Sequence, residues 1–274
     1  MPNRSVPSRR ATQLQRFTRL PYSTALRLLQ ADRRALEPTP EQERLEGLVF
    51  DGFRSISYGP TPGTVTQSIA CVEPARRSLT IHPGPGFELG DLVGGVTPLI
   101  EDGMFVSGVA GARLAWHPRG AVIHRPGIDA AVIFAGVPLL SWLKAARTDD
   151  PALRFATMDA IGRHERERWD GEGRWSSRYS SVVLRRLGML DALDATSVHM
   201  YGWHRGRMVE VIQPRAEPEM REQMIADLER SGLHLSRSRD LGGHSALLDF
   251  ATPDERDGVL RFRFIHSSLS DEAL

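Results

Sequence analysis

The spacing of hydrophobic and polar residues predicts two short helices at the start of the chain. Residues 8–19 and 23–35 both have helical spacing, and the second stretch carries leucines at positions 26, 28 and 29. Pro21 marks the break between them. The expected arrangement is a helix, a tight turn and a second helix.

A third helix is predicted to follow. Thr39 can cap its start, and Pro40 suits the first helical position. Gln42 stands three residues after the cap, as in a capping box. Leu45 and Val49, together with Leu48, would form its apolar face.

From about residue 53 to 128, short β-rich runs alternate with glycine and proline. This texture predicts antiparallel strands over residues 65–72, 78–82, 104–109, 112–117 and 121–124. The stretch 82–95 is expected to be a long loop rich in glycine and proline. Helices should return at 137–147, at 151–168 after Asp150 as the cap, and at 179–193.

The C-terminal part alternates strands with one helix. Strands are predicted over 198–203, 208–213, 233–235, 246–250 and 259–265, with a helix over 218–230 that ends at Gly232. In the last strand, Leu260, Phe262 and Phe264 alternate with Arg261 and Arg263, which predicts one buried face and one wet face.

Together these elements predict an α+β fold. It would combine an N-terminal helix-turn-helix-like module, a β-rich middle with a helical connector, and a C-terminal antiparallel sheet with a covering helix. The expected boundaries of the three regions are 1–52, 53–194 and 195–274.

Composition narrows the class of protein. The chain has 274 residues, of which 41% are hydrophobic, enough for a substantial core. Its single cysteine, Cys71, excludes an intramolecular disulfide and any metal site built from several cysteines. The longest apolar stretch, 130–143, is shorter than the roughly 20 residues that cross a bilayer. The first ten residues are not followed by an apolar segment, so no secretory signal is predicted. We therefore expect a cytoplasmic protein with no membrane partner.

Charge is distributed unevenly along the chain. The formal net charge is +1, but residues 1–34 contain eight arginines and one acidic residue, Asp32, for a local charge of +7. The rest of the chain therefore sums to about −6. If the protein contacts a polyanion, we expect it to use these first 34 residues.

Residues 14–29 read LQRFTRLPYSTALRLL. This segment resembles the helix-turn-helix of IclR-type transcriptional regulators, whose pattern is approximately L-A-x-x-T-G-L-P-x-S-T-V-x-R-L-L. Eight positions between Thr18 and Leu29 match, while Gln15 and Arg19 replace the alanine of the first helix and the glycine of the turn. Nothing after residue 35 resembles that family.

The resemblance implies that double-stranded DNA is the partner and that the second helix recognises it. Ser23 or Thr24 would cap this helix, and its first turns would face phosphates or base edges. The predicted DNA-binding residues are Arg19, Tyr22, Ser23, Thr24 and Arg27. The same residues are also compatible with an ordinary helical hairpin whose arginines face solvent.

Residues 163–186 form a second candidate nucleic-acid surface. Seven arginines are interleaved there with Trp169, Trp175 and Tyr179, and such side chains can stack on exposed bases. Four acidic residues reduce the local charge to +3. We interpret the stretch as an exposed helix with mixed charges.

Motifs for catalysis and metal binding are weak. None of the nine histidines belongs to a metal-ligand pattern, so no metal and no cofactor are predicted. Ser245 lies in a run that lacks the second glycine of G-x-S-x-G, and a nucleophile is not expected there. His117 and His124 flank one predicted hairpin and could converge, but the catalytic residues of any reaction stay unknown.

Three functions follow from these observations. The first is a cytoplasmic DNA-binding or DNA-associated accessory or regulatory protein that uses its arginine-rich helical module. The second is an enzyme with a pocket in the β-rich middle, where His117 or His124 acts as general base beneath the 82–95 loop. The third is an interaction protein whose arginine-rich arm docks an acidic protein partner. The residues favour the non-enzymatic functions, and they leave the DNA sequence and the oligomeric state open.

Overall fold

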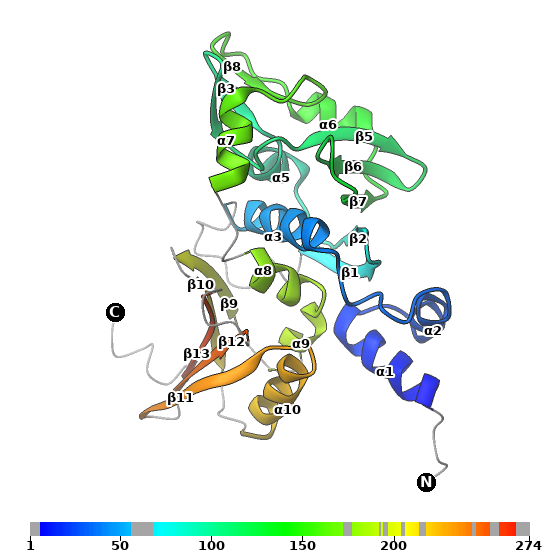
Figure 1. The fold of residues 1–274 in the computed structure, drawn as a ribbon, viewed down its shortest axis with the longest axis vertical. Helices are drawn as coiled ribbons and strands as arrows, with labels where there is room; N and C mark the ends of the chain where they lie inside the picture. Colours follow the sequence, from blue (N-terminus) through cyan, green and yellow to red (C-terminus); the bar gives the residue numbers. More distant parts are fainter. Residues whose placement is uncertain are drawn as a thin grey trace.

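The computed structural model describes residues 6–55, 68–171, 177–191, 193, 197–203, 206–213, 218–242, 245–252 and 258–266. Helices and strands form a mixed α+β arrangement, as the sequence predicts (Figure 1). Within these residues, no helix is both long and apolar enough to span a membrane.

The three N-terminal helices are present: α1 (Val6–Thr18), α2 (Tyr22–Ala31) and α3 (Pro40–Ser55). The second ends at Ala31 instead of continuing to residue 35. The predicted cap of α3 is confirmed, because the hydroxyl of Thr39 accepts a hydrogen bond from the Gln42 N–H at 3.3 Å. The Gln42 amide donates instead to Glu46 and to the Ala131 carbonyl, so it does not reach back to close a capping box.

The middle of the chain forms a five-stranded sheet in the order β1-β2-β7-β6-β5. Its strands are β1 (Ile69–Pro74), β2 (Ser78–Pro83), β5 (Arg113–His117), β6 (Gly120–His124) and β7 (Ala131–Ala135). All neighbours are antiparallel except β2 and β7, which run parallel. Of the strand predicted over 65–72, residues 65–67 lie outside the described part of the chain, and β1 begins at Ile69.

A smaller sheet has the order β4-β3-β8, from β4 (Met104–Ser107), β3 (Leu99–Glu101) and β8 (Leu153–Phe155). Strand β8 corrects the helix predicted over 151–168, in which only α7 (Arg163–Gly171) is helical. Pairing of Phe155 with Leu99 outweighs the local preference for a helix after Asp150. The predicted 82–95 loop is also partly wrong, because α5 (Leu89–Val96) begins within it.

The C-terminal region contains α8 (Ser177–Leu184), α9 (Leu187–Asp191) and α10 (Pro218–Glu229) beside a second five-stranded sheet. The sheet order is β11-β12-β13-β10-β9, and its strands are β9 (Ser197–Trp203), β10 (Gly206–Gln213), β11 (His234–Gly242), β12 (Ser245–Ala251) and β13 (Val259–His266). The strands and the covering helix lie close to their predicted positions, except that β11 is much longer than the strand predicted over 233–235. One pair differs from the expected antiparallel pattern, because β10 and β13 run parallel.

The helices α3 and α8 pack together between the two five-stranded sheets (Figure 1). Apolar residues from α3, both sheets, α8 and α10 form one continuous buried cluster. The alternation predicted for the last strand is confirmed, because Leu260, Phe262 and Phe264 are fully buried while Arg263 is exposed. Helix α6 (Leu139–Ala145) adds Trp142, whose indole N–H donates to the Thr97 hydroxyl at 2.9 Å.

Among the described residues, two ion pairs have both side chains buried. Arg185 donates to Glu46, and neither side chain is exposed. It also donates to the carbonyl oxygens of Ala35 and Ala75, so one guanidinium, which directly follows α8, joins α3, the segment before α3 and the β1–β2 turn. Arg113 and Glu165 form the second pair, at 2.7 Å. Removing one partner of such a pair strongly destabilises the folded protein, because the charge of the other partner is left buried and uncompensated.

The Arg113–Glu165 pair predicts a specific dependence of stability on pH. Burial alone would raise the pKa of Glu165, but hydrogen bonds from Arg113 and from backbone N–H groups bring that pKa below its ordinary 4.5. Because the pKa is lower in the folded state, the contribution to stability is complete above pH 4.5 and is lost as the pH falls through the folded-state pKa. We expect Glu165→Gln to be destabilised at neutral pH and to approach the parent protein in acid.

Urea unfolding of both proteins at neutral pH and below pH 4.5 measures this effect. Glu167→Gln is the matched control, because Glu167 is exposed on the same helix. A loss for Glu165→Gln that is equal at both pH values would contradict the prediction.

Candidate functional site

A three-residue turn joins α1 to α2. Arg19 occupies the left-handed region with φ of 61°, at the position where the resembled family carries glycine. A non-glycine residue in this conformation is strained and persists only when its surroundings hold it. Here the Arg19 guanidinium donates to both oxygens of Asp191 and, at 2.6 Å, to the carbonyl of Ile69. The side chain that replaces glycine therefore helps to fix the turn.

Helix α1 is anchored to the C-terminal part of the chain. Arg16 forms an ion pair with Asp227 of α10, a carboxylate that is almost fully buried. Gly188 of α9 lies directly against the Arg16 carbonyl, and any side chain there would collide with it. Leu14 and Phe17 of the same helix are also buried. The α1–α2 pair is consequently held at a fixed place on the body of the molecule.

The N-terminal half of α2 presents most of the predicted DNA-binding residues to solvent. Tyr22, Ser23 and Arg27 are exposed, Thr24 is half-buried, and Ala25 is buried against the protein. The predicted cap is wrong: Pro21 occupies the N-cap position, and no side chain caps the helix. Ser23 and Thr24 lie inside the first turn, so their hydroxyl groups are not used as the cap.

The fifth predicted residue, Arg19, lies apart from this surface. Its guanidinium is bound by Asp191 and the Ile69 carbonyl, and its side chain is only 16% exposed. Two more arginines of the basic N-terminal arm, residues 1–34, are neutralised in the same way. Arg16 pairs with Asp227, and Arg34 pairs with Glu37 at 2.6 Å. Arg9, Arg10, Arg27 and Arg33 are exposed, and no ion pair to them occurs among the described residues.

The stretch 163–186, rich in arginine and aromatic residues, is only in part the exposed helix with mixed charges that its sequence predicts. That interpretation fits α7, where Arg163 pairs with Glu167 on the surface. Trp169, however, is buried between the guanidinium groups of Arg44 and Arg125, at 4.4 and 4.6 Å from the ring centroid. Trp175 lies outside the described residues. Helix α8 is largely buried, including Tyr179, whose hydroxyl donates to the Gly258 carbonyl at 2.6 Å.

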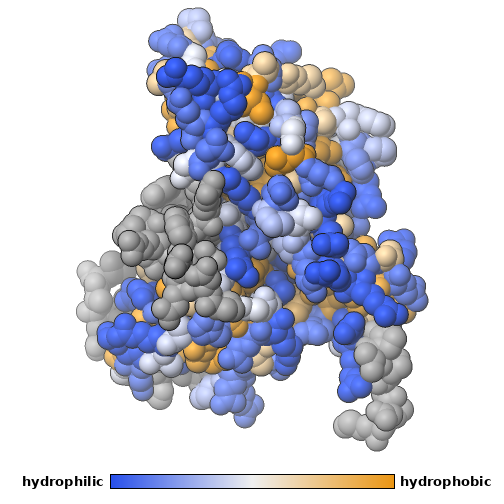
Figure 2. Space-filling model, viewed as in Figure 1, coloured by the Kyte–Doolittle hydropathy of each residue, from blue (hydrophilic) through white to orange (hydrophobic). Residues whose placement is uncertain are grey.

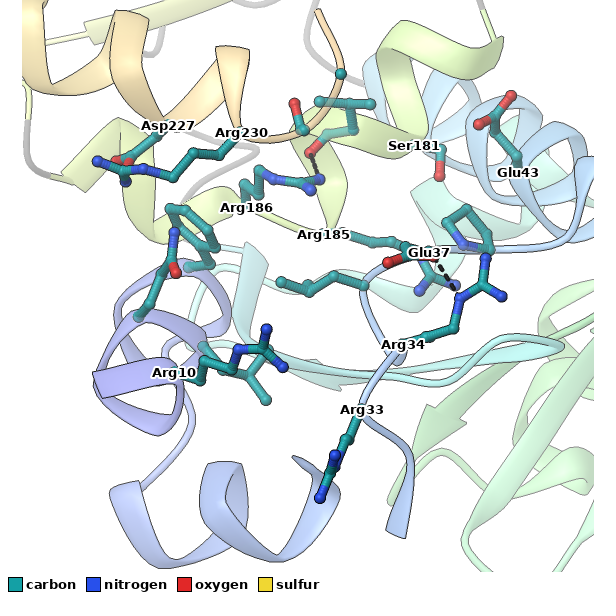
Figure 3. Close-up of a pocket in the computed structure, with 18 of the residues that line it drawn as sticks. Arg10, Arg33, Arg34, Glu37, Glu43, Ser181, Arg185, Arg186, Asp227 and Arg230 are labelled. Carbon is teal, nitrogen blue, oxygen red and sulfur yellow. Dashed lines mark hydrogen bonds and ion pairs between the residues drawn. The ribbon is translucent and has the colours of Figure 1, made fainter. Parts of the chain in front are cut away.

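A cavity of about 820 Å³ lies between the α1–α2 pair and the α8–α10 helices (Figure 3). We call it the arginine cavity, because seven arginines line it against three acidic residues. The arginines are Arg10, Arg33, Arg34, Arg178, Arg185, Arg186 and Arg230, and the acidic residues are Glu37, Glu43 and Asp227. The N-terminal arm and the 163–186 stretch, far apart in sequence, therefore meet at one site.

Sequence reasoning did not identify this site. One pattern nevertheless pointed to it: Arg185 and Arg186 interrupt the run VVLRRLGML, whose other residues are apolar or glycine. Charged residues are rarely buried without a partner, so two arginines inside an apolar run indicate buried cations with specific ligands.

The histidines of the middle sheet do not assemble a shared site. The β5–β6 register pairs His117 with Gly120 and His124 with Arg113, at opposite ends of the hairpin. Four residues of strand separate the two positions, about 13 Å. His82 is held by Glu73 at 2.9 Å. Burial, and then Arg113, lower the pKa of His124. Among the described residues, no group of three or more potential metal ligands is found. Gly243 and His244, next to Ser245, lie outside that part of the chain.

Comparison with protein-family models, curated proteins and solved structures found no match to this chain.

Proposed function

We propose that the protein is a DNA-associated regulatory protein that contacts duplex DNA through α2. The observation that carries this proposal is the exposed face of α2, formed by Tyr22, Ser23 and Arg27 directly after a three-residue turn. Helix-turn-helix proteins place the N-terminal residues of the second helix in the major groove. Tyrosine and serine can contact phosphates, and arginine can contact phosphates or guanine.

The electrostatics of the helical pair support the same function. Neither α1 nor α2 contains an acidic residue. The first turn of α2 has no side-chain cap, and the residues at this end, Pro21, Tyr22 and Ser23, are exposed, so the positive end of the helix dipole lies among exposed residues. Hydrophilic side chains predominate around this pair on the face drawn in Figure 2. An anionic surface would therefore be attracted to α2 and not repelled from it.

A point variant tests this proposal better than removal of the arm. Deleting residues 1–36 would remove Leu14 and Phe17 from the core and the Ala35 carbonyl from Arg185, so loss of binding could reflect unfolding. Arg27 is exposed, and its replacement should leave the fold intact.

We expect Arg27→Ala to weaken DNA binding and to reduce the slope of log affinity against log salt by about 1, because one phosphate contact is lost. Electrophoretic mobility shifts with mixed-sequence duplex over a series of salt concentrations measure both effects. Arg147→Ala removes another exposed arginine, in the segment after α6, and serves as the matched control. Equal affinities for the two variants, or no binding by the parent protein, would reject the proposal. A protein that co-purifies with the parent chain and is lost with Arg27→Ala would favour the acidic-partner function instead.

A further inference from the structure

The arginine cavity carries more positive charge than its own acidic groups neutralise. Arg34 pairs with Glu37, Arg178 approaches Glu43 at 4.0 Å, and Arg230 pairs with Asp227 at 2.6 Å. Arg185 is neutralised by Glu46, which does not line the cavity. Arg10, Arg33 and Arg186 form no ion pair with any described residue. Three cations of the cavity wall thus lack a carboxylate partner in the part of the chain that the structure describes.

Arg186 is the most informative of these three. Its residue is only 6% exposed, and its Nε–H has no hydrogen-bond partner. One terminal nitrogen is 3.4 Å from the Val182 carbonyl, at the long end of the hydrogen-bond range, and the guanidinium lies 5.6 Å from the centroid of Phe17. These contacts leave most of its five donors unused.

Asp227, which also lines the cavity, does not compensate for this charge. Asp227 already accepts hydrogen bonds from Arg16, Gln223 and Arg230. Burial, and then the neighbouring Arg185, lower the pKa of Arg186 to about 10 even though Asp227 acts in the opposite direction. A buried cation of this kind is stabilised by an anion that reaches it from the cavity.

The walls indicate the class of ligand. The volume of about 820 Å³ is within the usual range for small-molecule sites, roughly 300–1,000 Å³, and is far larger than a single phosphate ion requires. Apolar side chains line the cavity beside the arginines: Leu14, Phe17, Leu29, Leu36 and Val182. The ligand should therefore combine an anionic group with an apolar or planar part.

A phosphate monoester fits the charge better than a single carboxylate does. It carries a charge of about −1.5 to −2 at neutral pH and three acceptor oxygens, whereas a carboxylate carries −1 and two oxygens. The DNA backbone is less suitable as the occupant, because Arg186 is buried at the cavity wall while the proposed DNA contacts lie on the exposed face of α2.

We propose that the arginine cavity binds a small organic phosphate, with Arg186 as the buried anchor of the phosphate group and Arg10 as a second contact from α1. Figure 3 shows these two arginines reaching the cavity from different elements, Arg10 from α1 and Arg186 from the segment between α8 and α9. The ligand joins the helical pair to the body of the protein. Its binding does not depend on the proposed DNA function.

Isothermal titration calorimetry of the full chain with adenosine 5′-monophosphate, adenosine, inorganic phosphate and succinate tests the proposal. We expect the monophosphate to bind more tightly than inorganic phosphate, and adenosine and succinate to bind weakly or not at all. Equal binding of inorganic phosphate and the monophosphate would overturn the organic part of the proposal. If succinate bound more tightly than the monophosphate, the assignment to phosphate would be overturned. If neither the monophosphate nor inorganic phosphate bound, the site itself would be overturned.

Arg186→Met separates a binding role from a structural one. Methionine fills the buried space without a charge, so the variant should be at least as stable as the parent when no ligand is present. Its dissociation constant for the monophosphate should increase by about tenfold or more, the effect of losing a hydrogen bond to a charged group. Arg147→Met, which changes an exposed arginine outside the cavity, should bind like the parent.

A second variant keeps the proposal testable if Arg186→Met does not fold. Arg10 is exposed and forms no ion pair with the described residues, so Arg10→Ala should fold and bind the monophosphate severalfold more weakly. Unchanged binding by Arg10→Ala would overturn its role, and unchanged binding by folded Arg186→Met would overturn the proposal. Arg27→Ala should bind the monophosphate normally, so a failure of DNA binding is distinguishable from a failure of this site.

Discussion

Glu46→Ala should lower the free energy of unfolding by about 3–5 kcal/mol, because it leaves the charge of Arg185 buried without a counter-ion. Neither side chain of this pair is exposed, and Glu46 also accepts hydrogen bonds from Gln42 and Ser181. The substitution therefore removes the acceptor of three donor groups at once. Chemical denaturation followed by circular dichroism gives the unfolding free energy.

Glu41→Ala provides the matched control. Glu41 lies on the same helix but is exposed in its first turn, where its effect through the helix dipole is at most about 1 kcal/mol. In the double variant with Arg185→Met, the stranded cation is absent, so the two losses should be less than additive. A cost for Glu46→Ala no greater than that for Glu41→Ala would contradict the central role of this ion pair.

Gly188→Ala should cost about 1–3 kcal/mol or more, the usual range for forcing extra volume into a closely packed contact. The added methyl group would overlap the carbonyl oxygen of Arg16, a backbone atom that cannot rotate away. Relief requires α1 to move from α9, which would strain the ion pairs of Arg16 with Asp227 and of Arg19 with Asp191. We expect a lower thermal midpoint and faster tryptic cleavage at the arginines of α1.

Gly94→Ala makes the same chemical change at a helical glycine with open space around it. Because alanine favours helix over glycine, this control should be neutral or stabilising by up to about 1 kcal/mol. Similar stability and similar proteolysis of the two variants would show that the contact between α1 and α9 is not close.

Elements with strong local patterns could be predicted from the sequence. The alternation from Leu260 to Phe264 identifies the buried face of β13, and Thr39 identifies the start of α3. Both depend on residues within a few positions of each other. The turn between α1 and α2 was predicted for the same reason, although the interactions that hold Arg19 at positive φ come from residues 69 and 191.

Elements that depend on distant partners could not be predicted. Leu153 and Phe155 follow a helix-start pattern, yet they form a strand because β3 offers backbone partners. Helix α5 contains three glycines, so its sequence does not predict a helix. The helix is stabilised by the burial of Leu92, Val93 and Val96. In both cases tertiary pairing outweighs local preference.

The candidate site divides in the same way. Tyr22, Ser23 and Arg27 belong to a contiguous motif, and the structure leaves them exposed on one helix. The arginine cavity draws on residues from Arg10 to Gly232, which only the tertiary fold brings together. Periodicity gives no information on such distances, so Arg186 could be recognised as unusual from its apolar neighbours but not placed beside α1.

The ion pair between Arg185 and Glu46 also has a consequence for synthesis on the ribosome. The two residues are 139 positions apart, so Glu46 emerges long before the cation that neutralises it. The carbonyl oxygens of Ala35 and Ala75 accept hydrogen bonds from the same guanidinium, so they too lack this partner until residue 185 has been synthesised. Helix α3 therefore cannot complete its buried contacts while the middle sheet alone has been made. Nascent chains that end before α8 should stay protease-sensitive and dependent on chaperones, and folding should finish only once residue 185 has left the exit tunnel.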